Sequence, residues 1–257
     1  MTKRFGFTLA EVLITLGIIG VVAAMTIPTL ISNTNVAQFK TAYKKALSTL
    51  NQAVLMNLAM DDEDFSTLAK EADQSGTKLS ALLPARIQGS LDLGTDNKSS
   101  YFKSNTNGFK LGTGDGAETP ELTYQIACTA TETPTVDGGS ATACKDGVST
   151  VTINMDAGSD DNYGVFNFND GQIAFIYNKN AHECTETSAA ANKCYGFIDV
   201  NGAKNPNSVI DCSEKTGTTT VPCEVSGDDV TDIYPVVFHG QTVAPASDAA
   251  RAVLFGK

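Results

Sequence analysis

The chain has 257 residues, of which 42% are hydrophobic, so it can bury the core of one large domain or two small ones, and intrinsic disorder is excluded. It carries 18 Lys and Arg against 29 Asp and Glu, a net charge of −11. This balance provides no basic stripe to neutralise a phosphate backbone, so nucleic acid is not an expected partner.

The first expected element is a long apolar helix. Residues Val12 to Ile31 contain no charged side chain, and at about 1.5 Å per residue such a helix spans about 30 Å, the thickness of a bilayer core. Lys3 and Arg4 precede it, which favours a cytoplasmic N-terminus. Val22-Ala23-Ala24 is a weak secretory cleavage site, but the apolar run continues beyond it. Glu11 stands out, because a carboxylate in a membrane helix is usually kept for a partner.

The segment KRFGFTLAEVL, residues 3–13, resembles the signal of type IV prepilins and type II secretion pseudopilins: a short basic leader, Gly, and Phe-Thr-Leu-x-Glu before an apolar run. The resemblance implies that a prepilin peptidase cuts between Gly6 and Phe7 and methylates the new amine of Phe7. It also implies that Glu11 pairs with the N-terminal amine of a neighbouring subunit during assembly. The alternative is an interfacial Glu11 near the lipid headgroups with no special role.

Helical periodicity continues beyond the apolar run. Pro28 removes a backbone donor and clashes with the preceding turn, so we expect a kink or local unwinding there. The following segment is predicted to be an amphipathic continuation of the helix, because one apolar stripe recurs at steps of three and four; it comprises Val36, Phe39, Tyr43, Ala46, Leu50 and Val54. The alternative is a soluble helical bundle.

The second half of the chain predicts strands and tight turns. β-rich or alternating segments are expected at residues 122–126, 150–155, 164–168, 172–177, 195–200 and 233–238. Asn169-Asp170-Gly171 supplies the turn of a hairpin, and Pro235 is expected at a sheet edge or strand end because it cannot donate to a ladder.

These elements predict an α+β fold of the pilin-like lollipop kind, with a long N-terminal helix packed on an antiparallel sheet head. The expected organisation is a prepilin leader at residues 1–6, a transmembrane or filament-core helix at 7–31, its amphipathic continuation at 32–60, and a globular head at 61–257.

The six cysteines all lie in the second half of the chain, and none forms a C-x-x-C pair, which disfavours zinc and dithiol redox sites. Their even number behind an export-like N-terminus predicts three disulfides and an oxidising compartment. The loops that they bracket favour nearest-neighbour pairing, although other pairings are open in principle; free thiols in a cytosolic protein are the alternative. The predicted pairs are Cys128 with Cys144, Cys184 with Cys194, and Cys212 with Cys223.

One loop concentrates oxygen donors around a Gly turn, from residue 197 to 207. Calcium prefers six to eight such oxygens. The loop also resembles an Asp-x-Asn-Gly stretch near the C-terminus of pilin-like proteins, some of which bind calcium there. No cofactor is expected to be required, and calcium is the candidate ligand, with Asp199, Asn201 and Asp232 as its residues. An Asx-rich turn without an ion is the alternative.

No enzyme is expected, because the chain contains no G-x-S-x-G, H-E-x-x-H or Gly-rich phosphate loop. The resemblance implies instead a structural subunit of a type IV pilus or type II secretion pseudopilus. Its implied partners are copies of itself, other pilin-like subunits, a prepilin peptidase and N-methyltransferase, the inner-membrane assembly machinery, and membrane lipid before assembly. The implied location is the bacterial inner membrane, with the head outside the cytoplasm, and then a periplasmic pseudopilus or a surface pilus.

Two alternatives stay open at this point. The first is a minor or tip pilin whose head binds a surface, DNA or an exported substrate. The second is a secreted or membrane-tethered enzyme that uses a pilin-like export signal.

Overall fold

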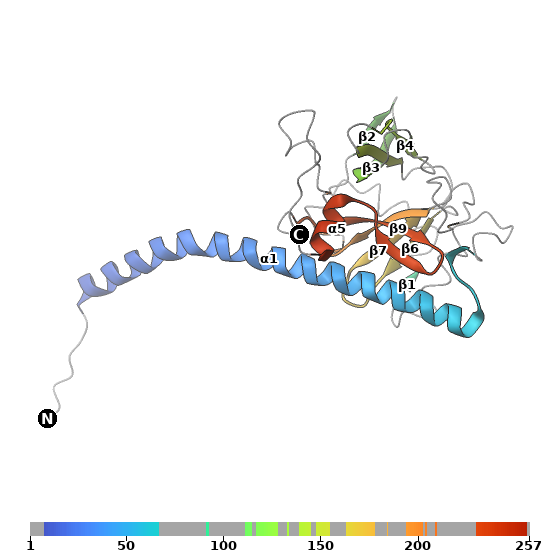
Figure 1. The fold of residues 1–257 in the computed structure, drawn as a ribbon. Helices are drawn as coiled ribbons and strands as arrows, with labels where there is room; N and C mark the ends of the chain where they lie inside the picture. The colour runs from blue at the N-terminus through green and yellow to red at the C-terminus, as the bar shows by residue number, and fades with distance from the viewer. Residues whose placement is uncertain are drawn as a thin grey trace. The chain divides into compact units, whose positions relative to one another are not determined.

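The structure is a computed structural model (Figure 1). It describes residues 8–66, 91–92, 111–114, 117–127, 133, 139–144, 148–154, 163–177, 184, 194–202, 204, 209 and 230–255. Several residues singled out from the sequence lie outside this set: the predicted leader with Gly6, and Phe7, Cys128, Cys212 and Cys223. The chain divides into two compact units, Met1–Gln38 and Phe39–Lys257, which are described separately.

Helix α1 runs without a break over Leu9–Asp61. Its end is defined by local hydrogen bonds: the N–H of Asp62 donates to the carbonyl of Leu58 (3.1 Å), and Asp62 has a positive φ of 58°. The Asn57 side chain donates to the carbonyl of Glu63 at 3.0 Å. The acidic segment at residues 61–64 therefore begins at the last residue of the helix and continues directly beyond it.

The second unit contains a six-stranded antiparallel sheet with the order β1-β6-β7-β8-β9-β10. The predicted hairpin is confirmed: β6 pairs with β7, and Gly171 in their turn has a φ of +85°. The strands are β1 (Leu91–Asp92), β6 (Tyr163–Asn167), β7 (Ile173–Tyr177), β8 (Cys194–Asp199), β9 (Ile233–His239) and β10 (Thr242–Pro245).

A second antiparallel sheet has the order β2-β3-β5-β4. Its strands are β2 (Leu111–Gly114), β3 (Ala117–Ala127), β4 (Gly139–Ala141) and β5 (Val148–Asn154). Strands β3 and β5 include the predicted segments 122–126 and most of 150–155. Helix α5 (Asp248–Phe255) closes the described chain.

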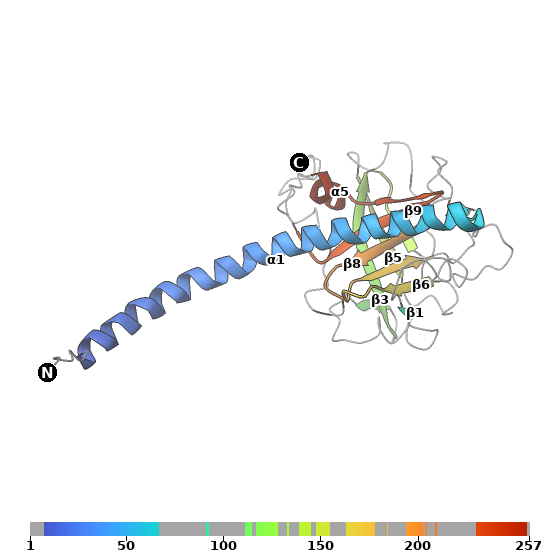
Figure 2. The same cartoon turned by 90° about the horizontal axis from the view of Figure 1, so that it is seen from below.

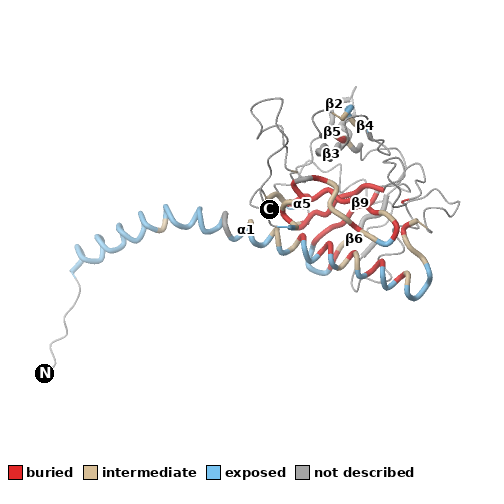
Figure 3. Tube along the Cα trace, in the orientation of Figure 1, coloured by how far each residue is buried: buried red, intermediate tan, exposed pale blue. Residues whose placement is uncertain are grey.

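The main core lies between the six-stranded sheet and residues 39–61 of α1, which cross one face of that sheet (Figures 1 and 2). Figure 3 shows the buried positions of α1 facing the buried strands. Of the predicted apolar stripe, Tyr43, Ala46, Leu50 and Val54 are buried, and Phe39 packs partly buried against them. The α+β fold with a long N-terminal helix on an antiparallel sheet is thus confirmed.

The free edge of the sheet at β10 is held by a side chain of the helix. Asn51 donates from Nδ2 to the carbonyl of Val243 and accepts the Val243 N–H on Oδ1, both at 2.9 Å. Its amide therefore pairs with the edge strand as another strand would, which positions α1 along β10.

The expectation for Pro235 was wrong in one respect. Pro235 lies within β9, an interior strand between β8 and β10, opposite Phe197. Its carbonyl accepts the N–H of Ala246 (2.9 Å), just beyond the end of β10. In an antiparallel ladder the N–H and C=O of one residue face the same neighbouring strand. The backbone N of Pro235, which has no hydrogen to donate, therefore faces the chain just beyond the end of β10, so no hydrogen bond between β9 and β10 is lost.

Candidate functional site

The N-terminus of α1 is closed by reciprocal hydrogen bonds between Thr8 and Glu11. The Thr8 N–H and hydroxyl both donate to Glu11 Oε2 at 2.8 Å, and the Glu11 N–H donates to Thr8 Oγ1 at 3.3 Å. This arrangement is a capping box, in which two otherwise unpaired backbone donors are satisfied. This role of Glu11 was not predicted, although the Thr-x-x-Glu spacing before an apolar run signals it.

Glu11 is thus a solvent-exposed carboxylate at the first turn of the helix, where the helix dipole favours negative charge. Both residues of the predicted cleavage site, Gly6 and Phe7, lie outside the described residues. Pairing of Glu11 with the Phe7 amine of another subunit therefore stays a prediction.

The apolar part of α1 has no protein partner within the described chain. By length and composition α1 can cross a membrane, and its most apolar stretch is not buried at all. The exposed side chains between residues 12 and 31 are those of Val12, Leu13, Ile14, Leu16, Ile18, Ile19, Val21, Val22, Met25, Ile27, Leu30 and Ile31. Such a surface requires lipid or other protein to cover it.

The hydroxyl groups of this stretch are satisfied within the helix. Thr15 donates to the Glu11 carbonyl (2.9 Å), Thr26 to that of Val22 (3.0 Å), and Thr29 to that of Thr26 (2.9 Å). Back-bonding of this kind lets hydroxyl side chains face an apolar medium. Pro28 lies inside α1. Because the helix continues through it, the expected local unwinding is not seen, and a kink stays a prediction.

The structure brings together the three residues of the predicted calcium site. Asp199 ends β8, Asp232 precedes β9, and both are fully buried. Between them, the Asn201 N–H donates to Asp199 Oδ1 (3.2 Å), and Asn201 Nδ2 donates to Asp232 Oδ2 (3.0 Å). The first bond is an Asx turn, the alternative considered from the sequence. Two buried carboxylates therefore converge on one loop residue.

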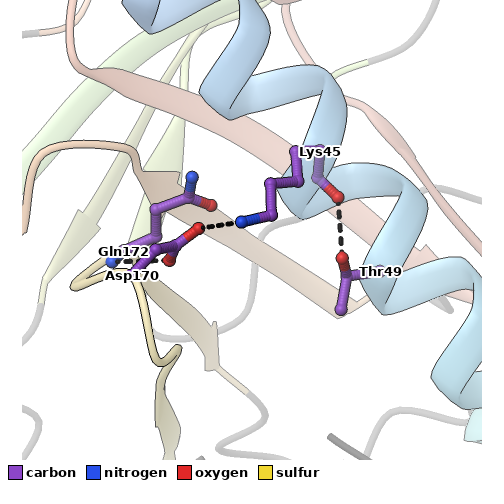
Figure 4. Close-up of polar contacts among 4 residues, drawn as sticks. All are labelled: Lys45, Thr49, Asp170 and Gln172. Atoms are coloured by element: carbon purple, nitrogen blue, oxygen red, sulfur yellow. Dashed lines mark hydrogen bonds and ion pairs between the residues drawn. The ribbon is translucent and has the colours of Figure 1, made fainter.

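A charged contact ties α1 to the β6–β7 turn beside this loop. Lys45 Nζ lies 2.7 Å from Asp170 Oδ2, and Asp170 Oδ1 accepts the N–H of Gln172 at 3.3 Å (Figure 4). The β6–β7 turn also contacts the candidate calcium loop. The two backbones are so close that a Cβ atom on Gly202 would lie only 2.4 Å from the carbonyl oxygen of Gly171. The loop and the turn are thus in backbone contact.

Two buried tyrosines stack between α1 and the six-stranded sheet, near Asp232. The rings of Tyr43 on α1 and Tyr234 on β9 stack with centroids 4.1 Å apart. Burial raises the pKa of the Tyr234 hydroxyl, and the Coulombic effect of Asp232 raises it further. Burial likewise raises the pKa of Tyr43, with an added contribution from Tyr234. Both hydroxyls therefore stay protonated at neutral pH.

The disulfide Cys184–Cys194 joins one of the three predicted pairs, with both residues buried and their Cα atoms 5.1 Å apart. Cys144 is also disulfide-bonded. The carbonyl of Cys184 accepts the N–H of Gly240 (2.6 Å), whose own carbonyl accepts the N–H of Phe65 (3.0 Å). The bond thus anchors the β9–β10 turn and the segment that follows α1.

The described residues contain no cluster of three or more His, Cys, Asp and Glu side chains placed to hold a metal ion. The candidate calcium set differs from such a cluster because it combines two carboxylates with an amide, and calcium accepts oxygen from either group.

In a comparison with known protein families, residues 1–27 match the prokaryotic N-terminal methylation motif. No curated protein and no solved structure matches the chain. The motif implies processing by a prepilin peptidase and assembly with other pilin subunits, and together with the apolar helix it indicates membrane anchoring. The chain therefore carries a prepilin signal of the type IV pilin and pseudopilin kind.

Proposed function

We propose that the chain is a structural subunit of a type IV pilus or type II secretion pseudopilus. It is made as a membrane-anchored prepilin, cleaved between Gly6 and Phe7, methylated on Phe7, and polymerised through α1. The observation that carries this proposal is the methylation motif over residues 1–27, followed by one continuous helix whose apolar stretch is wholly exposed in the single chain. Polymerisation covers that stretch once it leaves the lipid.

The location follows from the same features. Lys3 and Arg4 precede the apolar stretch, which favours an N-terminus on the cytoplasmic side of the inner membrane. The globular unit then lies outside the cytoplasm, where the buried Cys184–Cys194 disulfide is stable.

The last two turns of α1 support contacts between copies. The outward face of the helix is polar at Lys44, Ser48 and Gln52 but becomes apolar at Leu55, Met56 and Met60, which are 52%, 50% and 65% exposed. These three exposed apolar side chains form a separate patch at the end of α1, which adds to the surface that neighbouring subunits can cover in a filament.

Mass spectrometry of the mature protein tests the proposal. A mature chain that begins at methylated Phe7 is expected, whereas a chain that begins near Met25 would exclude the pilin-type processing. The abundance of the chain in purified filaments then separates a major subunit, which is abundant, from a minor or tip subunit, which is scarce.

Variants at Glu11 separate its charge from its cap. Glu11→Gln keeps an oxygen for the Thr8 donors but removes the charge, and Thr8→Ser keeps the hydroxyl of the capping box. We expect Glu11→Gln and Glu11→Ala to insert into the membrane but to assemble few filaments, and Thr8→Ser to assemble normally. Wild-type filament yield from Glu11→Gln would contradict the charge-pairing role.

We also propose that calcium binds at Asp199, Asn201 and Asp232. Two fully buried carboxylates that converge on one loop residue favour this second activity, and their hard oxygens suit calcium. These side chains supply part of the six to eight oxygens that calcium prefers. After removal of calcium with EGTA, added CaCl2 should raise the thermal unfolding midpoint of the full-length protein in detergent.

Two substitutions complete this test. Asp199→Asn should lose the calcium response, whereas Asp62→Asn, which changes an exposed acid beyond α1, should keep it. An equal response from Asp199→Asn and the wild type would exclude this site.

A further inference from the structure

One side of α1 is exposed along the globular unit (Figure 3), and its chemical character changes along the helix. Lys44 and Leu55 lie on the same side, because they are about three helical turns apart. This side is basic at Lys44, becomes apolar at the patch of Leu55, Met56 and Met60, and is followed by exposed Asp62 just beyond the helix. At about 1.5 Å per residue, the two charged residues are about 27 Å apart along the helix axis.

The charges at the two ends of this surface have no ion-pair partner among the described residues. Lys45 pairs with Asp170 at 2.7 Å, whereas the neighbouring Lys44 is exposed and makes no such contact. Asp62 is also exposed and unpaired. The last turn of α1 contains no basic residue. Because the C-terminal end of a helix dipole is negative, an acid at this place favours a cation from outside the chain.

We propose that Lys44 of one copy pairs with Asp62 of a second copy, and that the apolar patch at the end of α1 is covered in the same contact. This inference rests on the proposed function and names a surface through which the globular units associate. Since the two charges belong to different ends of the surface, the contact is head-to-tail. Such a contact leaves one end free on each copy, and it extends into an open filament when its rotation does not close a ring.

The charges favour a second copy over a lipid surface as the occupant. An anionic lipid surface would attract Lys44 but repel Asp62. A second copy supplies both charges in equal number, and an apolar patch between them. Another pilin-like subunit is the other candidate, which the experiment below separates from a copy of this chain.

The experiment measures filament yield from cells that express full-length Lys44→Glu, Asp62→Lys, the double variant, or the two single variants together. We expect each single variant to lower the yield about three- to tenfold, because the reversed charge replaces an attraction by a repulsion at every contact. The double variant should recover most of the yield. The two single variants expressed together should also recover it, because each reversed residue then meets its complement on the other chain.

Asp62→Asn guards against a folding defect in Asp62→Lys. Asp62 has a positive φ of 58°, which Asn tolerates better than Lys. Asp62→Asn should therefore keep the thermal unfolding midpoint of the single chain in detergent and still lower the filament yield, by less than the reversal does. A wild-type yield from both Asp62→Asn and Lys44→Glu would overturn the inference.

The remaining outcomes separate this inference from the proposed function. If the single variants assemble poorly but neither the double variant nor the mixture recovers, Lys44 and Asp62 do not pair between copies of this chain, and the inference is wrong while the proposed function stands. If the wild type forms no filaments and is not found in any, the proposed function fails, and the contact between copies fails with it.

Discussion

Replacing Asn51 by Ala tests how α1 is held at the edge of the sheet. The Asn51 side chain donates to the carbonyls of Leu47 and Val243 and accepts the N–H of Val243, each at 2.9 Å. Val243 is only 2% exposed, so truncation leaves its N–H and C=O unpaired and buried. A buried group left unsatisfied costs about 1–3 kcal/mol. Since Asn51 is half-buried and water reaches part of the site, we expect the free energy of unfolding to fall by about 2–4 kcal/mol.

The assay is urea unfolding of the full-length protein in detergent, followed by near-ultraviolet circular dichroism. Gln52→Ala is the control: Gln52 is exposed and its side chain donates to Ser48 Oγ at 3.1 Å, so its loss should cost less than about 0.5 kcal/mol. Asn51→Asp keeps an acceptor for the Val243 N–H but sets a charge against the Val243 carbonyl, so it should be no more stable than Asn51→Ala. If Asn51→Ala matched Gln52→Ala, the proposed pairing with β10 would be refuted.

Three further predictions concern the globular unit. Burial raises the pKa of Tyr195 above its ordinary 10.0, so its contribution to stability is present below pH 10 and falls as pH rises through the folded pKa, by up to about 1.4 kcal/mol per pH unit. Between these pH values, Tyr195→Phe should therefore lose stability less steeply than the wild type in alkaline unfolding curves, while the buried Tyr43 and Tyr234 still contribute. Gly202→Ala should be less stable than Gly171→Ala by about 1–3 kcal/mol in urea unfolding. Both glycines have a positive φ, but only a Cβ on Gly202 would clash with the backbone, 2.4 Å from the carbonyl oxygen of Gly171; equal losses of stability would exclude that clash. Replacing both Cys184 and Cys194 by Ala should lower the free energy of unfolding by about 2–3 kcal/mol, as expected for a disulfide that closes a short loop. In this variant, a reductant should no longer cause the loss of stability that reduction of this disulfide causes in the wild type.

Local patterns in the sequence predicted most of the elements that the structure contains. The hairpin of β6 and β7 follows from alternating apolar residues around Asn169-Asp170-Gly171, and Gly171 adopts the positive φ that such a turn requires. The apolar stripe at Tyr43, Ala46 and Leu50 is buried because helical spacing alone places these residues on one face. Both signals need only neighbours along the chain.

Pro235 and Asn51 show why other features were not predictable. The position of Pro235 is tolerated only because β10 ends beside it, which depends on strand order and length. Asn51 looks like an ordinary polar residue beside the stripe, and its pairing with Val243 joins residues 192 positions apart. Neither partner can be identified from residues nearby in the chain.

The prepilin signal, the apolar stretch and the amphipathic half of α1 could all be predicted from the order of the residues, because each depends on residues within a few helical turns. The same order singled out Asp199, Asn201 and Asp232 as oxygen donors. The contacts made across the fold could not be read from this order: Tyr43 of α1 stacks on Tyr234 of β9, and Asn201 bonds to both Asp199 and Asp232. The physical reason is that strand pairing and helix packing join residues far apart in the chain, and burial then changes what their polar groups require.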